Sequence, residues 1–254
     1  MIELKTPSEI DAIDAAGSVV ARVLAAVRAA AAPGVTPRSL DDMASDLIAE
    51  AGAVSSFRGY HPSWAPGPYP AVLCVSVDDA VVHGIPSAEP LADGALLSVD
   101  FAVHLDGWCA DAAFSTVVGS PSDPDQALID TAERALAAGI AAAGPGARMG
   151  DVAHAIGAVA RGAGYGMLAD HGGHGVGRSM HEAPPVPNEG KAGKGPRLHP
   201  GLVIAIEPML TRGTDRYRHD PDGWTLRTAD GSRAAHAEHT IAVTESGPRV
   251  LTTA

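Results

Sequence analysis

Four carboxylates interrupt apolar segments that have the length and composition of strands. Asp100 and Asp111 lie in the segment 96–114, Glu207 ends one apolar run, and Glu238 precedes another. Burying a carboxylate costs free energy unless it is paired or bound to a metal ion. One such residue alone is more simply explained by a loop cap or an arginine partner, but four in one core would repel one another. Together they favour a site for two divalent cations, whose charges would balance theirs.

The first two acids are predicted to share one face of a hairpin. Asp-Gly at 106–107 is a strong signal for a two-residue hairpin turn. A turn there places Asp100 opposite Ala113 and Asp111 opposite Ala102. Opposed residues share a face of the sheet, as do alternate residues of one strand. Asp100 and Asp111 are then diagonal neighbours, with Cα atoms roughly 7–8 Å apart, and can bind a common cation.

A glycine-rich segment at 171–181 offers histidines as nitrogen ligands. It holds His171, His174 and His181 among four glycines, which exclude a long helix and let the backbone approach a ligand closely. A phosphate-binding loop is the competing interpretation, but no Gly-Lys-Ser/Thr follows the glycines. His83 ends a short apolar strand at a Gly/Pro turn. Alone, it is typical of an ordinary core or turn histidine.

These residues must be positioned by elements that occur in two similar sets. Capping residues, prolines and helical periodicity predict helices that begin at Thr6 and Thr36, at Asp123 and near Gly150. Pro-Gly pairs end the first and third of these helices, and glycines end the other two.

The segments 94–108 and 201–224 follow the two helix pairs, and each has a glycine, an apolar strand with an acid, and then Asp-Gly-Trp. We therefore predict an α+β fold of duplicated helix–helix–hairpin units around a central antiparallel sheet. The expected organisation is one catalytic domain, 1–254, with pseudo-twofold halves at about 6–120 and 121–250. A ligand site between the halves would take acids from each.

Composition narrows the class of protein. The chain has 254 residues, of which 46% are hydrophobic and 19% charged, so bulk disorder is excluded. Two cysteines provide neither a disulfide framework nor a cysteine-based zinc site. A formal net charge of −12 argues against binding to DNA. With no apolar run of about 18 residues and no apolar signal core, we expect a cytoplasmic globular protein without a membrane partner.

The combined motifs resemble the bacterial type I methionine aminopeptidases, which are pita-bread metallohydrolases, over about 6–250. The matching segments are 81–86, 98–100, 106–107, 110–111, 173–177, 180–182, 206–209 and 238–240. The resemblance implies the pita-bread fold and removal of the N-terminal methionine from peptides or nascent chains. It also implies a preference for a small second residue.

The resemblance also implies roles for residues of this chain. The five implied metal ligands are Asp100, Asp111, His174, Glu207 and Glu238. They would hold two divalent ions, with Asp111 and Glu238 bridging, and the donor set suits Co, Mn, Fe, Zn or Ni. The implied catalytic residues are Glu207, which would transfer a proton, and His181 and His83, which would contact substrate. The implied methionine side-chain pocket consists of Tyr60, Tyr69, Cys74 and Trp224.

Two departures and two alternatives accompany this resemblance. The segment 62–67 is an insertion relative to shorter members, and Met180 replaces the common aromatic residue. One alternative is an X-Pro aminopeptidase or dipeptidase on the same fold, which usually carries an extra N-terminal domain. The other is a non-enzymatic pita-bread binding protein, which typically loses metal ligands and gains basic surface. All five ligands and the acidic balance of this chain favour the enzyme.

The expected partners follow from the implied substrate. A nascent chain would bring the protein to the ribosome, and Lys191, Lys194 and Arg197 form a short basic stretch. We favour a solvated loop for this stretch, with a transient contact to ribosomal RNA as the alternative. We expect a monomer.

Overall fold

A computed structural model describes residues 2–168 and 170–253. The helices in these residues are α1 (Pro7–Ala30), α2 (Pro37–Glu50), α3 (Asp123–Ala142) and α4 (Met149–Gly162). The strands are β1 (Val54–Ser55), β2 (Cys74–Val77), β3 (Ala80–Val82), β4 (Leu96–Leu105), β5 (Trp108–Val117), β6 (Gly166–Met167), β7 (Gly172–Gly175), β8 (Glu182–Pro187), β9 (Val203–Ile206), β10 (Met209–Thr211), β11 (Tyr217–His219), β12 (Leu226–Thr228), β13 (Ala234–His236), β14 (Glu238–Thr244) and β15 (Gly247–Val250). None of the helices in the described residues has an apolar stretch long enough to cross a bilayer.

Local capping chemistry explains where the helices begin. Thr6 accepts the backbone N–H of Glu9 at 3.4 Å, and the Glu9 carboxylate accepts the N–H of Thr6 at 2.8 Å, which is a capping box. The predicted cap of the third helix, Asp123, is wrong by one residue. Ser122 caps α3 because its hydroxyl accepts the N–H of Asp125, so Asp123 is already helical.

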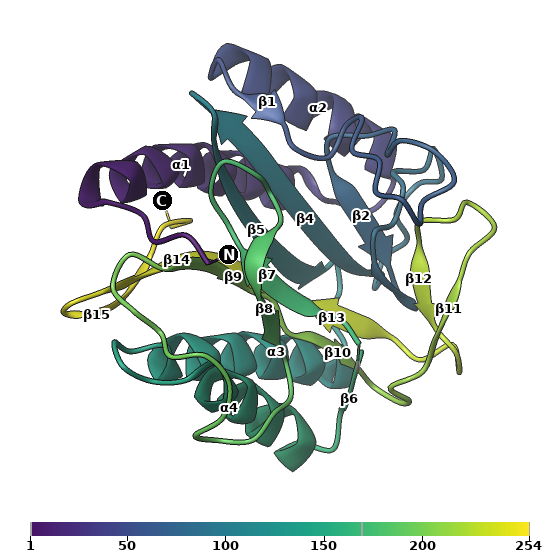
Figure 1. The fold of residues 1–254 in the computed structure, drawn as a ribbon. Coiled ribbons are helices and arrows are strands. Elements are labelled where there is room, and N and C mark those ends of the chain that lie inside the picture. Colours follow the sequence, from purple (N-terminus) through teal and green to yellow (C-terminus); the bar gives the residue numbers. More distant parts are fainter. Residues whose placement is uncertain (1, 169, 254) are drawn as a thin grey trace.

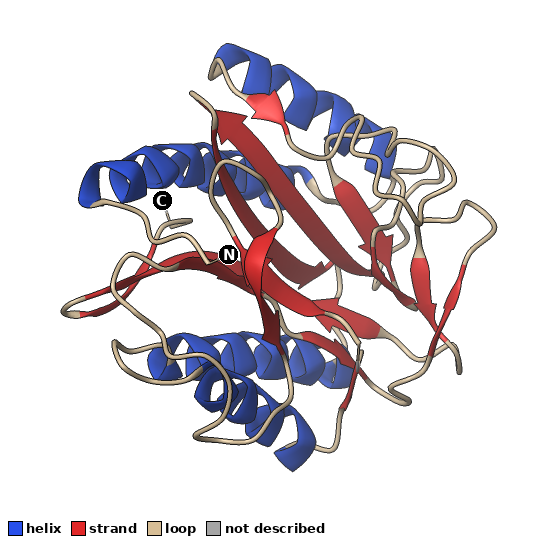
Figure 2. Cartoon of the chain, in the orientation of Figure 1, coloured by secondary structure: helices blue, strands red, loops and turns tan. Residues whose placement is uncertain are grey.

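The main sheet is antiparallel and runs in the order β1-β4-β5-β14-β9-β7-β8, with β2 beside β4 and β15 beside β14. The pair α1–α2 lies on one side of the molecule and the pair α3–α4 on the other, with the strands between them (Figures 1 and 2). One hydrophobic cluster packs residues of α1 and α2 against β4 and β5. A second cluster packs α3 and α4 against β9 and β14. This architecture confirms the predicted fold class.

The first hairpin has the predicted register. Asp100 lies opposite Ala113 and Asp111 opposite Ala102 in the β4–β5 ladder. Asp106, in the turn, adopts a φ of 51°, in the left-handed region that such turns require and that aspartate tolerates better than most residues. The side chains between the acids, such as Phe101, are fully buried on the opposite face.

The second hairpin differs from the prediction. The strand that leads to Glu207, β9, pairs with β14 and not with β12, the strand that directly follows Asp222-Gly223. The Asp222-Gly223 pair lies in the connection between β11 and β12, which form a small sheet with β3. An Asp-Gly turn signal reports that two strands meet locally, and the rest of the molecule decides which sheet they join.

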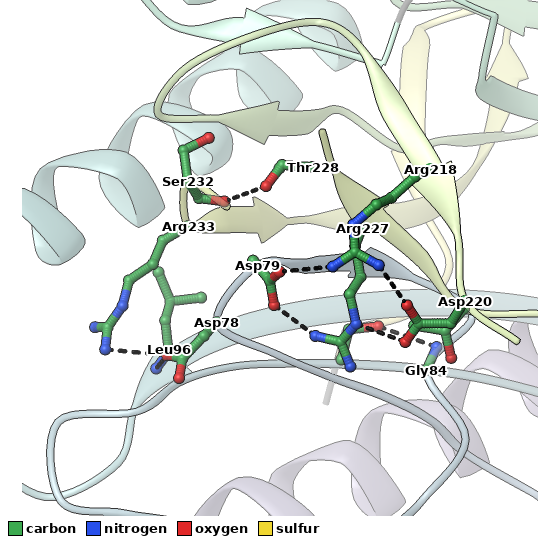
Figure 3. Close-up of polar contacts among 12 residues, drawn as sticks. Asp78, Asp79, Gly84, Leu96, Arg218, Asp220, Arg227, Thr228, Ser232 and Arg233 are labelled. Atoms are coloured by element: carbon green, nitrogen blue, oxygen red, sulfur yellow. Dashed lines mark hydrogen bonds and ion pairs between the residues drawn. The ribbon is translucent and has the colours of Figure 1, made fainter. Parts of the chain in front are cut away.

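Ion pairs hold this small sheet against the turn between β2 and β3. The Arg227 guanidinium lies between Asp79 and Asp220, and the Arg218 Nη1 pairs with the Asp220 Oδ1 at 2.9 Å (Figure 3). Arg227 and its two acids are only about one-third exposed or less. The connection between β11 and β12, which carries Trp224, is therefore fastened to the strand that precedes His83.

Candidate metal centre and substrate cavity

Five elements deliver the predicted ligands to one cavity of about 240 Å³. The contributing residues are Asp100 on β4, Asp111 on β5, His174 on β7, Glu207 directly after β9, and Glu238 at the start of β14. Ligand atoms of Asp111, His174 and Glu238 all lie within 4.8 Å of one another. The His174 Nε2 is 3.6 Å from the Glu207 Oε1. Residues from both halves of the sequence therefore converge.

The strand register explains this convergence. Ala113 of β5 lies opposite Asp100 of β4 on one side and opposite Glu238 of β14 on the other. Opposed residues share a face, so these two acids point the same way as Asp111. Next along the sheet, Ile206 pairs with His239, which brings Glu207 alongside Glu238.

The buried oxygens of this cluster lack partners. Among the described residues, the Asp100 Oδ1, the Asp111 Oδ1 and the Glu238 Oε1 are buried without a hydrogen bond. Burial is the largest cause that raises the pKa of Asp111 to about 7 and that of Glu207 to about 8. Burial and the charge of Asp111 also raise the pKa values of Asp100 and Glu238 well above their usual range. Unpartnered carboxylate oxygens aimed into one cavity fit the ligation of divalent cations.

His174 presents the correct nitrogen to the carboxylates. Its Nδ1 donates to the backbone carbonyl of Gly175 at 2.9 Å, which leaves the Nε2 lone pair free to ligate. Burial lowers the pKa of His174 to about 3. The imidazole is therefore neutral near pH 7, as a metal ligand must be.

The remainder of the cavity is an aromatic and sulfur-lined pocket. All four predicted pocket residues, Tyr60, Tyr69, Cys74 and Trp224, line it, as do Phe57 and Met180. Tyr69 packs edge-on against Trp224, with ring centroids 5.0 Å apart. Its hydroxyl donates to the carbonyls of Leu73 and Gly84 at 3.0 and 2.8 Å. This wall of the cavity therefore presents mainly aromatic and sulfur atoms, and the Tyr69 hydroxyl already has hydrogen-bond partners within the protein.

His83 and His181 flank the carboxylate cluster. His83 has a φ of 61°, an uncommon backbone conformation for a residue other than glycine. Burial lowers its pKa to about 4, and its Nδ1 is buried without a partner in the described chain. The His181 ring lies 4.2 Å from that of His174, and its Nδ1 shares a hydrogen bond of 3.2 Å with the Tyr60 hydroxyl. Both imidazoles are available to a ligand in the cavity.

Two further residues belong to this region: sequence reasoning missed His236 and left the role of Trp64 open. His236, on β13, is 1% exposed, and its Nε2 lies 3.7 Å from the Glu207 Oε2 and 3.9 Å from the Glu238 Oε2. Its position two residues before Glu238 was the available signal. Trp64, in the inserted segment, lines the cavity beside His83.

A curled antiparallel sheet flanked by helix pairs, with carboxylates and one imidazole meeting at its centre, defines the class of pita-bread metallohydrolases. The chain belongs to metallopeptidase family M24, whose model matches residues 11–245.

Two proteins of known class match over nearly their whole length. The chain is 52% identical over 259 residues to methionine aminopeptidase 1 of Mycobacterium tuberculosis, covering 99% of this chain and 95% of the relative. It superimposes on the crystal structure of a methionine aminopeptidase from Thermotoga maritima with a TM-score of 0.95 and 38% identity, covering 100% of both chains.

The fold is also shared with longer enzymes. A prolidase from Pyrococcus furiosus aligns with a TM-score of 0.76 and 22% identity, over 99% of this chain but 65% of the prolidase. This likeness shows the fold alone.

Proposed function

We propose that this chain is a methionine aminopeptidase that hydrolyses the first peptide bond of chains beginning with methionine. The observation that carries the proposal is the single cavity of about 240 Å³ that joins the carboxylate cluster to an aromatic pocket. An unbranched thioether suits such a pocket, because sulfur–aromatic contacts are favourable and the side chain adapts to an irregular wall.

In this proposal the residues that would hold two divalent ions are Asp100, Asp111, His174, Glu207 and Glu238. Co, Mn, Fe, Zn and Ni are all compatible with four carboxylates and one imidazole. When bound, such ions polarise a carbonyl and lower the pKa of water, which supplies the nucleophile.

The side chains around the ions would move protons and orient the peptide. Glu207 accepts a proton from the attacking water and returns it to the leaving amine. His181 donates a hydrogen bond to the developing oxyanion. His83, which lines the cavity, contacts the scissile nitrogen. Tyr69, Cys74 and Trp224 enclose the methionine side chain.

The finer biological setting is part of the same proposal. The substrate is a peptide or nascent chain with a small second residue, and the enzyme acts as a cytoplasmic monomer. For the basic stretch Lys191, Lys194 and Arg197 we keep the interpretation of a solvated loop, because all three side chains are exposed.

The test is a comparison of peptides and metals with one matched variant. Metal-stripped protein is given each divalent metal in turn and assayed on Met-Ala-Ser and on Ala-Pro peptides. We expect metal-dependent release of methionine from the first peptide and no cleavage of the second. Cleavage of the Ala-Pro peptide would instead support an X-Pro enzyme. In Asp111→Asn, an isosteric change without the charge, both activity and bound metal should be lost. Normal turnover by that variant would contradict the dinuclear site.

A further inference from the structure

The inserted segment 62–67 carries a large apolar side chain in an unusual position. Trp64 is 56% exposed, yet it lines the catalytic cavity. It also lines a second cavity of about 430 Å³, together with His83, His171, His219, Gly223 and Leu226. Among the described residues, Trp64 and His83 alone line both cavities. The indole and the imidazole therefore form the partition between them.

The contacts of Trp64 place it at the mouth of the catalytic cavity and not at its floor. Its ring stacks on His83 with a centroid distance of 6.3 Å and an interplanar angle of 24°. It meets the Trp224 ring edge-on at 5.1 Å. Tyr69 and Cys74, in the deep wall, are buried, whereas Trp64, Tyr60 and His181 are the more accessible lining residues. A peptide held in the cavity must leave it past these side chains.

The segment is held at both ends, so the indole has a defined position. The Tyr69 N–H donates to the Tyr60 carbonyl at 2.8 Å, which closes the base of the loop. The Ala65 N–H donates to the Pro62 carbonyl at 3.0 Å within it. Pro66 packs on Gly223, where an added Cβ would lie 2.5 Å from the Pro66 Cγ. Prolines in the segment further restrict its backbone.

We infer that Trp64 is a specificity-determining residue that limits the size of the second residue of the substrate. The inference rests on the proposed function, in which His83 contacts the scissile nitrogen. The residue after that nitrogen then lies against the indole that stacks on His83. Small side chains fit beside the ring, and larger ones collide with it. Removing the indole would join the catalytic cavity to the outer cavity and make room for branched or longer side chains.

The test measures selectivity with the metal-loaded enzyme. The ratio of kcat/KM for Met-Leu-Ser to that for Met-Ala-Ser is determined for wild type, Trp64→Ala and Trp64→Phe. A matched control is Ser63→Ala, an exposed neighbour that lines neither cavity. We expect the ratio to rise at least about tenfold in Trp64→Ala and by less in Trp64→Phe, since changes of a few carbons in a pocket have effects of this size. The ratio in Ser63→Ala should equal that of wild type.

Each result decides the question. An unchanged ratio in both Trp64 variants, or a proportional loss on both peptides, would overturn the inference. Melting temperature and metal content, measured on the same preparations, identify a variant that fails to fold. If Trp64→Ala does not fold, the smaller rise of the kcat/KM ratio expected in Trp64→Phe is the test. If wild type releases no methionine from either peptide, the proposed function fails, and that outcome is distinct from an unchanged ratio.

Discussion

Removing the metal ions should make the stability of this protein fall as the pH rises above neutrality. In the metal-free protein, burial is the main cause that raises the pKa of Asp111 to about 7 and that of Glu207 to about 8. Unfolded carboxyl groups have pKa values of about 4, so the folded state holds these protons more tightly. The stabilisation is complete below about pH 4 and is lost as the pH rises through the folded-state values.

The magnitude follows from the pH range between about 6.5 and about 8.5. Each pH unit between the unfolded and folded pKa values is worth about 1.4 kcal/mol. Over this range, the ionisation of Glu207 therefore lowers the free energy of unfolding of the protein by about 2 kcal/mol, and that of Asp111 lowers it by about 1 kcal/mol. Asp100 and Glu238, whose pKa values are also raised by burial, add to the loss. For a chain of this length, about 3 kcal/mol corresponds to roughly 6–12 °C in melting temperature.

The lower limit of the range keeps the buried histidines out of the measurement. Burial lowers the pKa of His83 to about 4 and those of His174 and His236 to about 3. A lowered pKa gives stability that is present above the unfolded value of about 6.5 and is lost only as the pH falls. Above about pH 6.5, the carboxylates are therefore the groups that change most. Burial also raises the pKa values of the Cys74 and Cys109 thiols, which lower the stability in the same direction only near the upper limit of the range.

The assay is thermal unfolding of metal-stripped and Mn²⁺-loaded protein at several pH values. The loaded protein should melt at a higher temperature, by mass action, and the difference should grow with pH because the metal competes with protons. In the control variant Glu207→Gln, the amide cannot ionise, so the metal-free protein should lose about 2 kcal/mol less unfolding free energy over this range. A melting temperature of metal-free wild type that stays constant or rises across this range would refute the reasoning.

Three further changes test the surroundings of the site. Alanine at His181 removes the proposed oxyanion donor and should lower kcat about 10²-fold, while metal content by atomic absorption stays at the wild-type level; loss of metal would identify a ligand instead. Alanine at Gly223 adds a methyl 2.5 Å from the Pro66 Cγ at a φ of +75°. It should cost about 1–3 kcal/mol in denaturant unfolding, and an unchanged midpoint would contradict the packing. Alanine at Arg227 removes the guanidinium that lies between Asp79 and Asp220. It should raise KM for Met-Ala-Ser more than it lowers kcat, and equal KM values would show that these ion pairs do not position the pocket.

Local sequence signals determined the parts of this protein that depend on neighbours in the chain. Thr6 and Thr36 marked helix starts because a hydroxyl can accept a nearby backbone N–H. The Asp-Gly turn at 106–107 set the register of its hairpin, and the two-residue period of a strand then put Asp100 and Asp111 on one face. The one-residue error at Asp123 arose because Ser122 offers an equally good cap.

Tertiary structure decided which distant strands are neighbours. The pairing of β14 with β5 brings Glu238 to Asp111, and it depends on the packing of both helix pairs against one sheet. In the same way, β12, the strand after Asp222-Gly223, pairs with β3 rather than with the central sheet. Long-range packing likewise brought His236 to the carboxylates of Glu207 and Glu238 and Trp64 to the wall of the cavity. Turn geometry and capping act over a few residues, whereas the pairing of distant strands depends on the burial of the whole core. For this reason the sequence alone did not determine which distant strands pair.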